Sequence, residues 1–153
     1  MKKLIAVFAL ALIPLGGMAA GGGGVQLEQA NIDLSNHAAI QRGAKLFVNY
    51  CMGCHSAKYM SYERMSKDLG LTKEQVLENL IFSDAKIGSY MTIAMPAQSA
   101  DWFGTMPPDL SVVSRSRGND WLYTYLRTFY VDNSRPFGVN NLVFKDVAMP
   151  HVF

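Results

Sequence analysis

Apolar residues recur at helical intervals in the segment 36–51, NHAAIQRGAKLFVNYC. Intervals of four, three and four residues place four of them on one face of a predicted α-helix: Ile40, Ala44, Phe47 and Cys51. Gly43 lies inside this helix and costs about 1 kcal/mol of helix propensity relative to alanine. Either another part of the protein packs closely against the backbone at Gly43, or the glycine is simply tolerated there.

The pattern predicts two further short helices after this one. Residues 57–70, AKYMSYERMSKDLG, are typical of a weakly amphipathic helix that ends at Gly70. Thr72 and Gln75 have the spacing of a capping box, in which each side chain bonds the other residue's backbone amide at the start of a helix. This next helix carries an apolar stripe that we expect to face the core: Val76, Leu77, Leu80 and Ile81.

Residues 83–111 combine glycines and prolines with scattered methionine and aromatic residues, which predicts a long loop. Loops of this length are uncommon in a compact domain unless they serve a function, such as wrapping around a bound group. Asn119 or Asp120 can then cap a helix over residues 121–130, and a final loop covers residues 132–153. The apolar face of that last helix holds Leu122, Tyr125, Leu126 and Phe129. A few helices joined by long loops, with no clear strand alternation, predict a mainly α fold.

The N-terminus has the order of charged, apolar and small residues that is typical of a secretory signal peptide. Its apolar run is about a dozen residues long, whereas a membrane-spanning helix needs ~20. We therefore expect cleavage, with an uncleaved N-terminal anchor as the alternative, and no later stretch is apolar enough to cross a bilayer. The predicted organisation is a signal peptide at residues 1–20, a Gly-rich tether at 21–32 and one domain at 33–153.

The net charge gives no indication of a nucleic-acid partner. Removing Lys2 and Lys3 with the leader lowers the number of basic residues from 14 to 12, which equals the 12 acidic residues. A nucleic-acid interface would need lysine and arginine clustered on one face. We therefore expect an exported protein that does not bind nucleic acid.

Both cysteines of the chain lie in the stretch YCMGCHS, residues 50–56, and one of its three histidines follows the second cysteine directly. Export would place this pair in an oxidising compartment, where a disulfide is the default use of two cysteines. The spacing C-x-x-C-H, however, is the attachment signal for c-type haem, whose vinyl groups form thioethers with the two thiols. In this interpretation Cys51 and Cys54 anchor the porphyrin and His55 is the proximal iron ligand.

Two other chemistries also use closely spaced cysteines. A thiol-disulfide oxidoreductase carries its first thiol at a helix N-terminus after a strand, whereas Cys51 follows a helical pattern. Zinc would need further ligands, and the remaining histidines, His37 and His151, are distant in sequence. The flanking residues therefore favour haem, and a redox disulfide, zinc and a structural disulfide remain as alternatives.

A haem held by one histidine leaves a sixth iron position, for which methionine is a common ligand. Met149 in AMPH and Met95 in AMPA each precede a proline, which favours extended backbone, so either could present its sulfur from a loop. The haem propionates need charged partners or solvent, and Arg115 and Arg117 in SRSRG are candidates for pairing with them. Other methionines are better interpreted as packing against an apolar ring: Met52, Met60, Met65 and Met106.

Three blocks carry a resemblance to a known family: RGAKLFVNYCMGCHSAKYM, WFGTMPPDLSVVSRSRGNDWLYTYLRTFY and VNNLVFKDVAMPHVF. Together they resemble the cytochrome c1 family, the haem subunits of the proteobacterial ubiquinol:cytochrome c oxidoreductase, or cytochrome bc1 complex. The likeness runs from about Gly22 to Phe153. C-x-x-C-H is common to c-type cytochromes, whereas the PPDLS and DWLYTYLR blocks are far more specific. The resemblance implies a class I cytochrome c-like fold around one haem c.

The resemblance also implies roles for individual residues. Cys51 and Cys54 correspond to the thioether anchors, His55 to the proximal ligand and Met149 to the distal ligand. Met95 falls in a loop away from the iron. A second group of residues corresponds to the family's haem surroundings: Pro107 and Pro108, beside the proximal histidine, where a backbone carbonyl would accept the Nδ1 proton, and Arg117 with Trp121, near the propionates.

By the same resemblance, the protein would be an electron carrier and not an enzyme on its own. It would accept an electron from a Rieske iron-sulfur protein and pass it to a soluble cytochrome c, beside cytochrome b at the periplasmic face of the inner membrane. The sequence stops four residues after Met149, so the family's C-terminal helix and membrane anchor are expected to be missing. The alternatives are a free-standing periplasmic cytochrome c and a periplasmic dithiol oxidoreductase.

Overall fold

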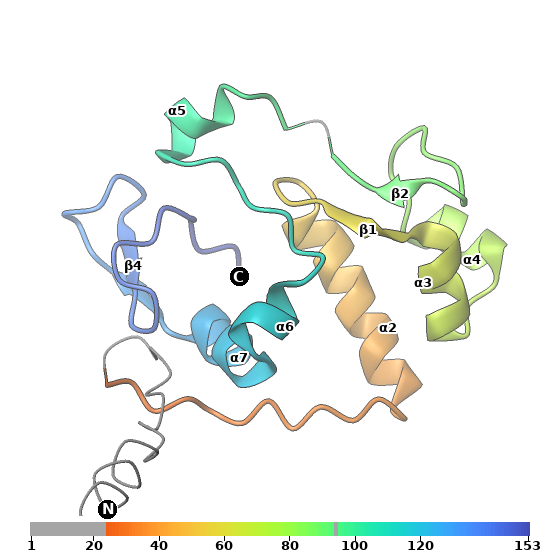
Figure 1. The fold of residues 1–153 in the computed structure, drawn as a ribbon, viewed down its shortest axis with the longest axis horizontal. Helices are drawn as coiled ribbons and strands as arrows, with labels where there is room; N and C mark the ends of the chain where they lie inside the picture. The colour runs from red at the N-terminus through yellow and green to blue at the C-terminus, as the bar shows by residue number, and fades with distance from the viewer. Residues whose placement is uncertain (1–23, 94) are drawn as a thin grey trace, which may run out of the picture.

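The computed structural model describes residues 24–93 and 95–153. The predicted signal peptide lies outside these residues, and the predicted tether is described from Gly24 onward. Helix α2 (His37–Leu46) crosses the middle of the molecule (Figure 1) and continues without a break into a π-helical turn, η2 (Phe47–Cys51). The helix predicted over residues 36–51 is confirmed, although its last turn is wider than an α-helical one.

The apolar face of this helix is also confirmed. Ile40, Ala44 and Phe47 pack against the buried core cluster. A Cβ added at Gly43 would meet no atom within 4 Å in the part of the chain that the structure describes, so no described residue packs closely against the backbone there.

Residues 57–70 contain a strand as well as a helix. Strand β1 (Ala57–Ser61) pairs antiparallel with β2 (Tyr90–Met91), and helix α3 (Tyr62–Leu69) follows β1 directly. The prediction of one weakly amphipathic helix was therefore wrong. The strand residues diluted a clear helical pattern, in which Tyr62, Met65 and Leu69 are all buried. The predicted end of the helix is confirmed, since Gly70 is its C-cap at φ 63°, a left-handed conformation that suits glycine.

Helix α4 (Lys73–Asn79) opens with the predicted capping box. The Gln75 amide donates to Thr72 Oγ1 at 3.2 Å, and the Thr72 amide donates to Gln75 Oε1 at 2.8 Å. Val76 is fully buried, and Leu80 and Ile81 are buried too. Leu77 instead remains exposed, so the buried stripe is narrower than predicted.

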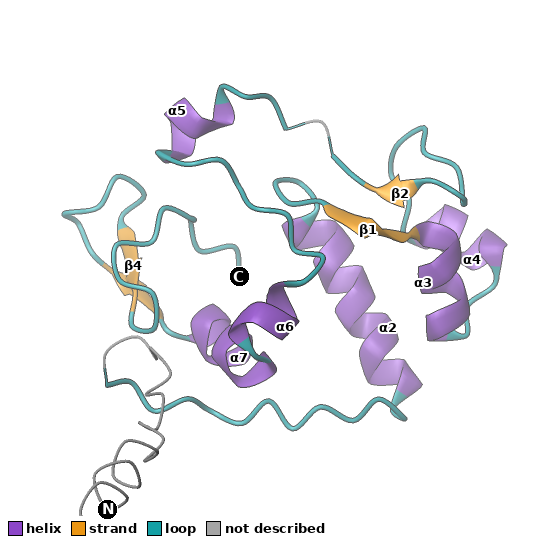
Figure 2. Cartoon of the chain, in the orientation of Figure 1, coloured by secondary structure: helices purple, strands orange, loops and turns teal. Residues whose placement is uncertain are grey.

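The second half of the chain contains short elements linked by loops (Figure 2). Helix α5 (Ser99–Phe103) interrupts the predicted loop, and α6 (Val113–Arg117) follows it. Helix α7 (Asn119–Arg127) leads into β3 (Phe129–Val131), which pairs antiparallel with β4 (Val139–Asn141) in register Phe129 to Asn141. The fold is mainly helical and class I cytochrome c-like, as predicted, with two two-stranded sheets that the sequence pattern did not indicate.

The start of α7 differs from the prediction. No side chain caps this helix, whose N-cap position is Gly118. The Asp120 carboxylate instead accepts the amide of Ala30 at 2.9 Å, in the extended N-terminal segment that runs along α7 (Figure 1). Arg127 adds an ion pair with Glu28 at 2.9 Å, which ties the same segment to the other end of the helix.

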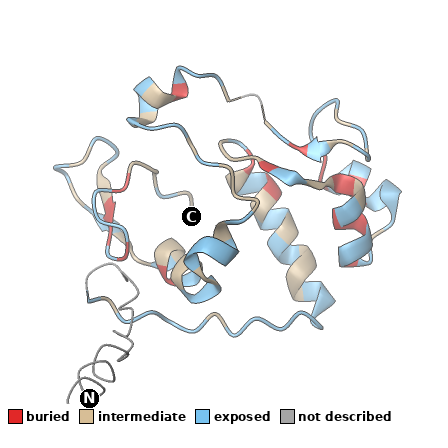
Figure 3. Cartoon of the chain, viewed as in Figure 1, coloured by how far each residue is buried: buried red, intermediate tan, exposed pale blue. Residues whose placement is uncertain are grey.

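Most of the buried apolar side chains lie between Val48 and Met91, and Figure 3 marks all buried residues along the chain. The main cluster extends from Val48 to Met91, and of the described residues beyond Met91 only Val143 and Val147 are buried and hydrophobic. Met52 and Met65 belong to this cluster and Met60 packs against it, while Met106 is exposed. Over residues 24–93 and 95–153, no helix is long and apolar enough to cross a membrane.

Candidate cofactor site

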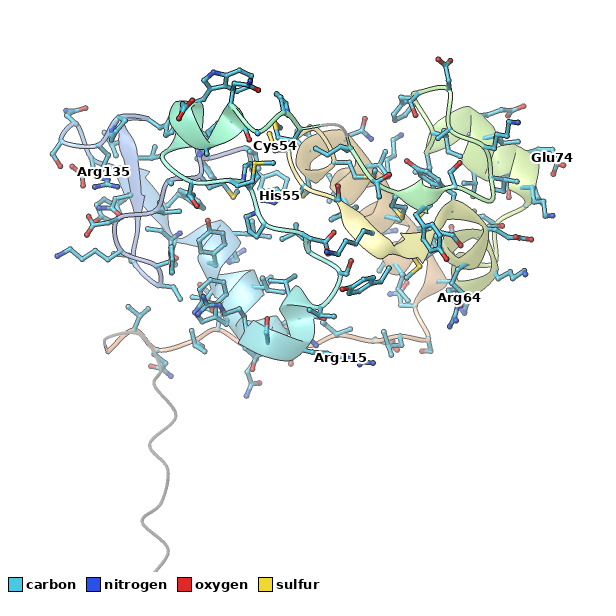
Figure 4. All side chains as sticks on the ribbon, turned by 45° about the horizontal axis from the view of Figure 1, so that its top comes forward. Cys54, His55, Arg64, Glu74, Arg115 and Arg135 are labelled. Atoms are coloured by element: carbon cyan, nitrogen blue, oxygen red, sulfur yellow. The ribbon has the colours of Figure 1, made fainter. Side chains whose placement is uncertain are left out.

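The end of the long helix sets the geometry of the cysteine motif. The π-helical turn closes with the Met52 amide bonded to the Phe47 carbonyl at 3.0 Å. The amides of Cys54 and His55 then both donate to the Cys51 carbonyl, at 3.0 and 2.9 Å. The Cys51 carbonyl thus accepts two hydrogen bonds that curl the backbone of the motif back toward its first cysteine. Cys54 and His55 lie near the middle of the molecule, as Figure 4 shows.

Both thiols are free and partly buried. Burial raises the pKa of the Cys51 thiol above its usual range. A protonated thiol is a poor nucleophile, so the first cysteine lacks the lowered pKa that a thiol-disulfide oxidoreductase uses. Within the described residues, no group of three or more histidine, cysteine, aspartate or glutamate side chains could hold a metal ion, which disfavours a zinc site.

A backbone carbonyl fixes the histidine. His55 Nδ1 lies 2.7 Å from the carbonyl oxygen of Pro108. Because a carbonyl can only accept, the Nδ1 atom carries the proton and the lone pair is left on Nε2. This is the arrangement in which a metal-binding imidazole is oriented by its second nitrogen. The loop containing Pro108 is thus where the sequence resemblance placed it, beside His55.

Three bonds hold this loop against β1. The amide of Lys58 donates to Asp109 Oδ2 at 2.9 Å, the amide of Tyr59 donates to Ser111 Oγ at 3.1 Å, and the amide of Leu110 donates to the Ser56 carbonyl at 2.8 Å. The carbonyl that orients His55 is therefore part of a braced segment. His55 cannot rotate without losing a bond to it.

Met149 lies next to a tyrosine of α7. The Tyr125 hydroxyl donates to Met149 Sδ at 3.4 Å. Burial raises the pKa of Tyr125 to about 12, so the hydroxyl stays protonated and able to donate at neutral pH. The C-terminal segment that carries Met149 also reaches the long helix, since the rings of Phe153 and Tyr50 are 5.3 Å apart.

Met95 lies in a different environment. It lines a cavity of about 220 Å³ together with Cys54, Ser56, Pro107 and Asp109, among other residues. Pro107 and Asp109 flank Pro108, whose carbonyl contacts His55 Nδ1, so this cavity borders the loop that orients His55. The larger cavity, about 570 Å³, lies between the N-terminal segment and Tyr123 and contains neither a cysteine nor a histidine.

The two candidate arginines differ in their contacts. The Arg117 guanidinium lies over the ring of Trp121 at 5.1 Å and near that of Phe144 at 5.8 Å. Arg115, on the same short helix, points away at the surface (Figure 4). The structure therefore brings together Arg117 and Trp121, and through the stacking of Trp121 on Tyr125 at 5.0 Å it connects them to the neighbourhood of Met149.

Sequence reasoning missed Tyr125 and a buried asparagine pair, Asn140 and Asn141, as parts of the site. Tyr125 was assigned to the apolar face of its helix, although its hydroxyl could have indicated a hydrogen bond to another residue. The NN doublet closes β4, where a polar pair between apolar neighbours could have indicated buried hydrogen bonds.

These observations fit a covalently attached haem. Two free thiols and an imidazole with an available Nε2 lie within five residues, from Cys51 to His55. The second half of the chain buries few apolar side chains of its own and leaves several large ones exposed, which suits packing around a large apolar ring. These exposed side chains include Trp102, Val112, Leu142 and Phe144.

Comparisons with known proteins agree with this interpretation of the site. Residues 29–87 match the model of the Cytochrome C1 family. The chain is 54% identical over 153 residues to cytochrome c1 of Allochromatium vinosum, covering 99% of this chain and 62% of that protein. It is 50% identical over 129 residues to the ammonia monooxygenase gamma subunit of Nitrosomonas europaea, covering 84% of this chain and 55% of that protein.

A more distant relative is the mitochondrial heme protein cytochrome c1-2 of Solanum tuberosum. The two sequences are 29% identical over 124 residues, covering 69% of this chain and 46% of the potato protein. The chain thus spans 62%, 55% and 46% of the lengths of these three curated relatives.

Proposed function

Because the chain belongs to the cytochrome c1 family, we propose that it transfers single electrons from a Rieske iron-sulfur protein to a soluble cytochrome c. Proteins of this family bind a covalently attached haem c, which supplies the one-electron redox chemistry. The observation that carries the proposal is the His55 contact with Pro108, because it leaves Nε2 free for iron directly after two free thiols.

In this proposal each site residue has a defined role. Cys51 and Cys54 would hold the haem through thioethers, and His55 and Met149 would both bind its iron. Met149 is preferred to Met95 because, by the sequence resemblance, Met149 corresponds to the distal ligand and Met95 falls in a loop away from the iron. Two protein ligands would leave no iron position open, which suits electron transfer and disfavours binding of oxygen or peroxide.

Arg117 and Trp121 would contact the haem propionates. Stacking on Trp121 keeps the Arg117 guanidinium in place while its charge remains available for a carboxylate. Arg115 shows no such contact with Trp121, so Arg117 is the stronger candidate.

The proposed setting is the cytochrome bc1 complex, with cytochrome b and the Rieske protein as partners at the periplasmic face of the inner membrane. Attachment to the membrane through a C-terminal anchor is part of the same proposal. A one-electron transfer makes and breaks no bond in a substrate, so this chain would act as a carrier within the complex and not as an enzyme by itself.

Expression of the chain in a periplasm with c-type haem maturation machinery tests the cofactor chemistry. A denaturing gel stained for haem should show a positive band for the wild type, because thioethers survive boiling with reductant. The Cys51→Ala, Cys54→Ala double variant is the matched control and should be colourless. A colourless wild-type band would contradict covalent attachment and favour a thiol function.

Membrane extracts from the source organism test the partners. Cytochrome b and a Rieske protein should copurify with the chain, which would argue against a free-standing periplasmic cytochrome c. The relative from Nitrosomonas europaea has the name of a subunit of another oxidoreductase. The proteins that copurify therefore also distinguish the cytochrome bc1 complex from a complex of the kind that this relative's name indicates.

Met149→Ala tests the distal ligand. The haem should stay attached through Cys51 and Cys54, while the sixth position opens and the midpoint potential falls, because a thioether stabilises ferrous iron. Ferric absorption spectra and redox titration measure both effects, with Met95→Ala as the control. An unchanged Met149→Ala protein alongside an altered Met95→Ala protein would transfer the role to Met95.

A further inference from the structure

The segment that carries Met149 begins at two buried asparagines. Asn140 and Asn141 close strand β4 and are 3% and 1% exposed. Residues 142–149, which we call the methionine loop, follow them directly and contain no helix or strand. Buried asparagine side chains must have hydrogen-bond partners, and the partners of these two lie almost entirely on the methionine loop and on the elements beside it.

Asn141 binds the beginning of the loop. Its Oδ1 accepts the amides of Val143 and Phe144, at 2.9 and 3.1 Å. Its Nδ2 donates to the Tyr125 carbonyl at 2.7 Å. Tyr125 in turn donates its hydroxyl to Met149 Sδ at 3.4 Å. One residue of α7 therefore connects Asn141, at the start of the loop, with Met149, at its end.

Asn140 binds the middle of the loop. Its Oδ1 accepts the amides of Asn141 and Asp146, at 2.9 and 2.8 Å, and its Nδ2 donates to Asp132 Oδ2 at 2.9 Å. Asp146 has φ 60°, a conformation that non-glycine residues rarely adopt without support. Arg135 supplies further support by donating to the Asp146 carbonyl at 2.9 Å. The turn three residues before Met149 is thus held from two sides.

We propose that Asn140 and Asn141 are positioning residues that hold the methionine loop with Met149 facing the haem iron. The inference rests on the proposed role of Met149 as axial ligand and extends it to residues that touch neither iron nor haem. The loop has an arrangement that presents the sulfur and arrangements that do not. The buried bonds of the two asparagines favour the first by immobilising the backbone at both its start and its middle.

Binding of an external ligand reports how often the loop leaves the iron. Imidazole added to the ferric haem protein must displace Met149, so its apparent affinity rises with the fraction of molecules in which the loop is open. Asn141→Ala removes three bonds around the loop and should tighten imidazole binding roughly tenfold to hundredfold. The midpoint potential should fall in parallel, as in Met149→Ala.

Asn141→Asp is a second variant with the same shape. It keeps an oxygen for the amides of Val143 and Phe144 but places an acceptor, in place of a donor, opposite the Tyr125 carbonyl, so its imidazole affinity should also rise above that of the wild type. Asn133→Ala is the matched control. Asn133 is an exposed asparagine in the turn between β3 and β4, and its replacement should leave imidazole affinity and potential unchanged.

Haem staining and far-ultraviolet circular dichroism establish that each variant is folded and loaded. If Asn141→Ala does not fold, Asn141→Asp decides the question. Variants that melt at lower temperature but bind imidazole as weakly as the wild type would overturn the inference, because a merely structural role lowers stability without opening the sixth position. An unchanged Met149→Ala protein would instead overturn the ligand assignment and this inference together.

Discussion

At the level of single residues, a carbonyl and a hydroxyl contact the two proposed iron ligands. The Pro108 carbonyl orients His55, and the Tyr125 hydroxyl contacts the sulfur of Met149. Neither group is charged, and each acts through the orientation of its hydrogen bond. A proton held on Nδ1 leaves Nε2 as the metal-binding atom, while a donor at sulfur withdraws electron density from a thioether ligand.

Tyr125→Phe tests the second contact through the redox potential. If Met149 binds the iron as proposed, its sulfur would donate more strongly without this hydroxyl and favour the ferric state, so the midpoint potential should fall while both proposed ligands stay bound. Redox titration and the ferric spectrum measure these effects. Tyr123→Phe, which removes an exposed hydroxyl from the same helix, should leave the potential unchanged. A potential unaffected by Tyr125→Phe would show that the contact has no electronic effect.

The raised pKa of Tyr125 also predicts a dependence of stability on pH. In the unfolded chain this tyrosine loses its proton near pH 10, but burial raises its pKa to about 12 in the folded protein. Its contribution to stability is therefore complete below pH 10 and is lost as pH rises toward 12. The loss should be about 1 kcal/mol after allowance for partial solvent exposure.

Denaturant unfolding at pH 9 and pH 11.5 measures this loss as a difference between proteins. The decline in unfolding free energy should be smaller in Tyr125→Phe than in the wild type, with Tyr123→Phe again as the control. Equal declines in the wild type and Tyr125→Phe would show that burial does not hold the proton on Tyr125.

At the level of helices and strands, the sequence pattern correctly predicted the elements that depend on contacts between residues close in sequence. The intervals from Ile40 to Phe47 gave the long helix, and the spacing of Thr72 and Gln75 gave a helix start that is present in the structure. Strands β2, β3 and β4 were missed because they have only two or three residues each, fewer than the alternation pattern needs, whereas the five residues of β1 were assigned to the helix that follows them.

Long-range bonds explain the other differences from prediction. Asp120 looks like a helix cap locally, but its carboxylate binds an amide 90 residues away in sequence. In the candidate site, the motif from Cys51 to His55 was evident from spacing. The residues alone left Met149 and Met95 as candidates, and the family resemblance was needed to choose Met149 and to indicate Pro108. The bond between Asn141 and the Tyr125 carbonyl spans 16 residues and has no local signature.

Thr72→Ala tests the capping box. Loss of the bond from the Gln75 amide to Thr72 Oγ1 should lower the free energy of unfolding by about 1 kcal/mol. Chemical denaturation of the haem-loaded protein measures the change. Thr105→Ala, at an exposed position in a loop, is the control and should have little effect. Equal stability of the two variants would mean that the cap does not stabilise α4 in the folded protein.

Across the whole molecule, the distribution of buried side chains is uneven. Residues up to Met91 have their own apolar cluster, whereas the described residues beyond Met91 bury only Val143 and Val147 among their hydrophobic side chains. A bound haem would supply the missing apolar surface, since a large ring buried between segments stabilises them as side chains do. The second half should therefore depend on the cofactor for its stability.

Hydrogen exchange of the Cys51→Ala, Cys54→Ala variant tests this dependence. Amides of residues 48–91 should remain protected without haem, while those of residues 113–153 should exchange much faster than in the loaded wild type. Mass spectrometry of peptides from both proteins resolves the two regions. Equal protection of residues 113–153 in the presence and absence of haem would contradict a cofactor-dependent second half.

The π-helical turn between Phe47 and Cys51 has a consequence for how the chain tolerates insertions and deletions. Such a turn contains one residue more than the α-helical turn that it replaces. Deleting Asn49 would allow regular α-helix up to the motif and rotate Cys51 by about 100° around the helix axis, since each residue advances the helix by that angle. The thiols and His55 would then turn away from Pro108, whose carbonyl contacts His55. The extra residue therefore sets the rotational phase between the face of α2 that packs into the core and the face that presents the cofactor ligands.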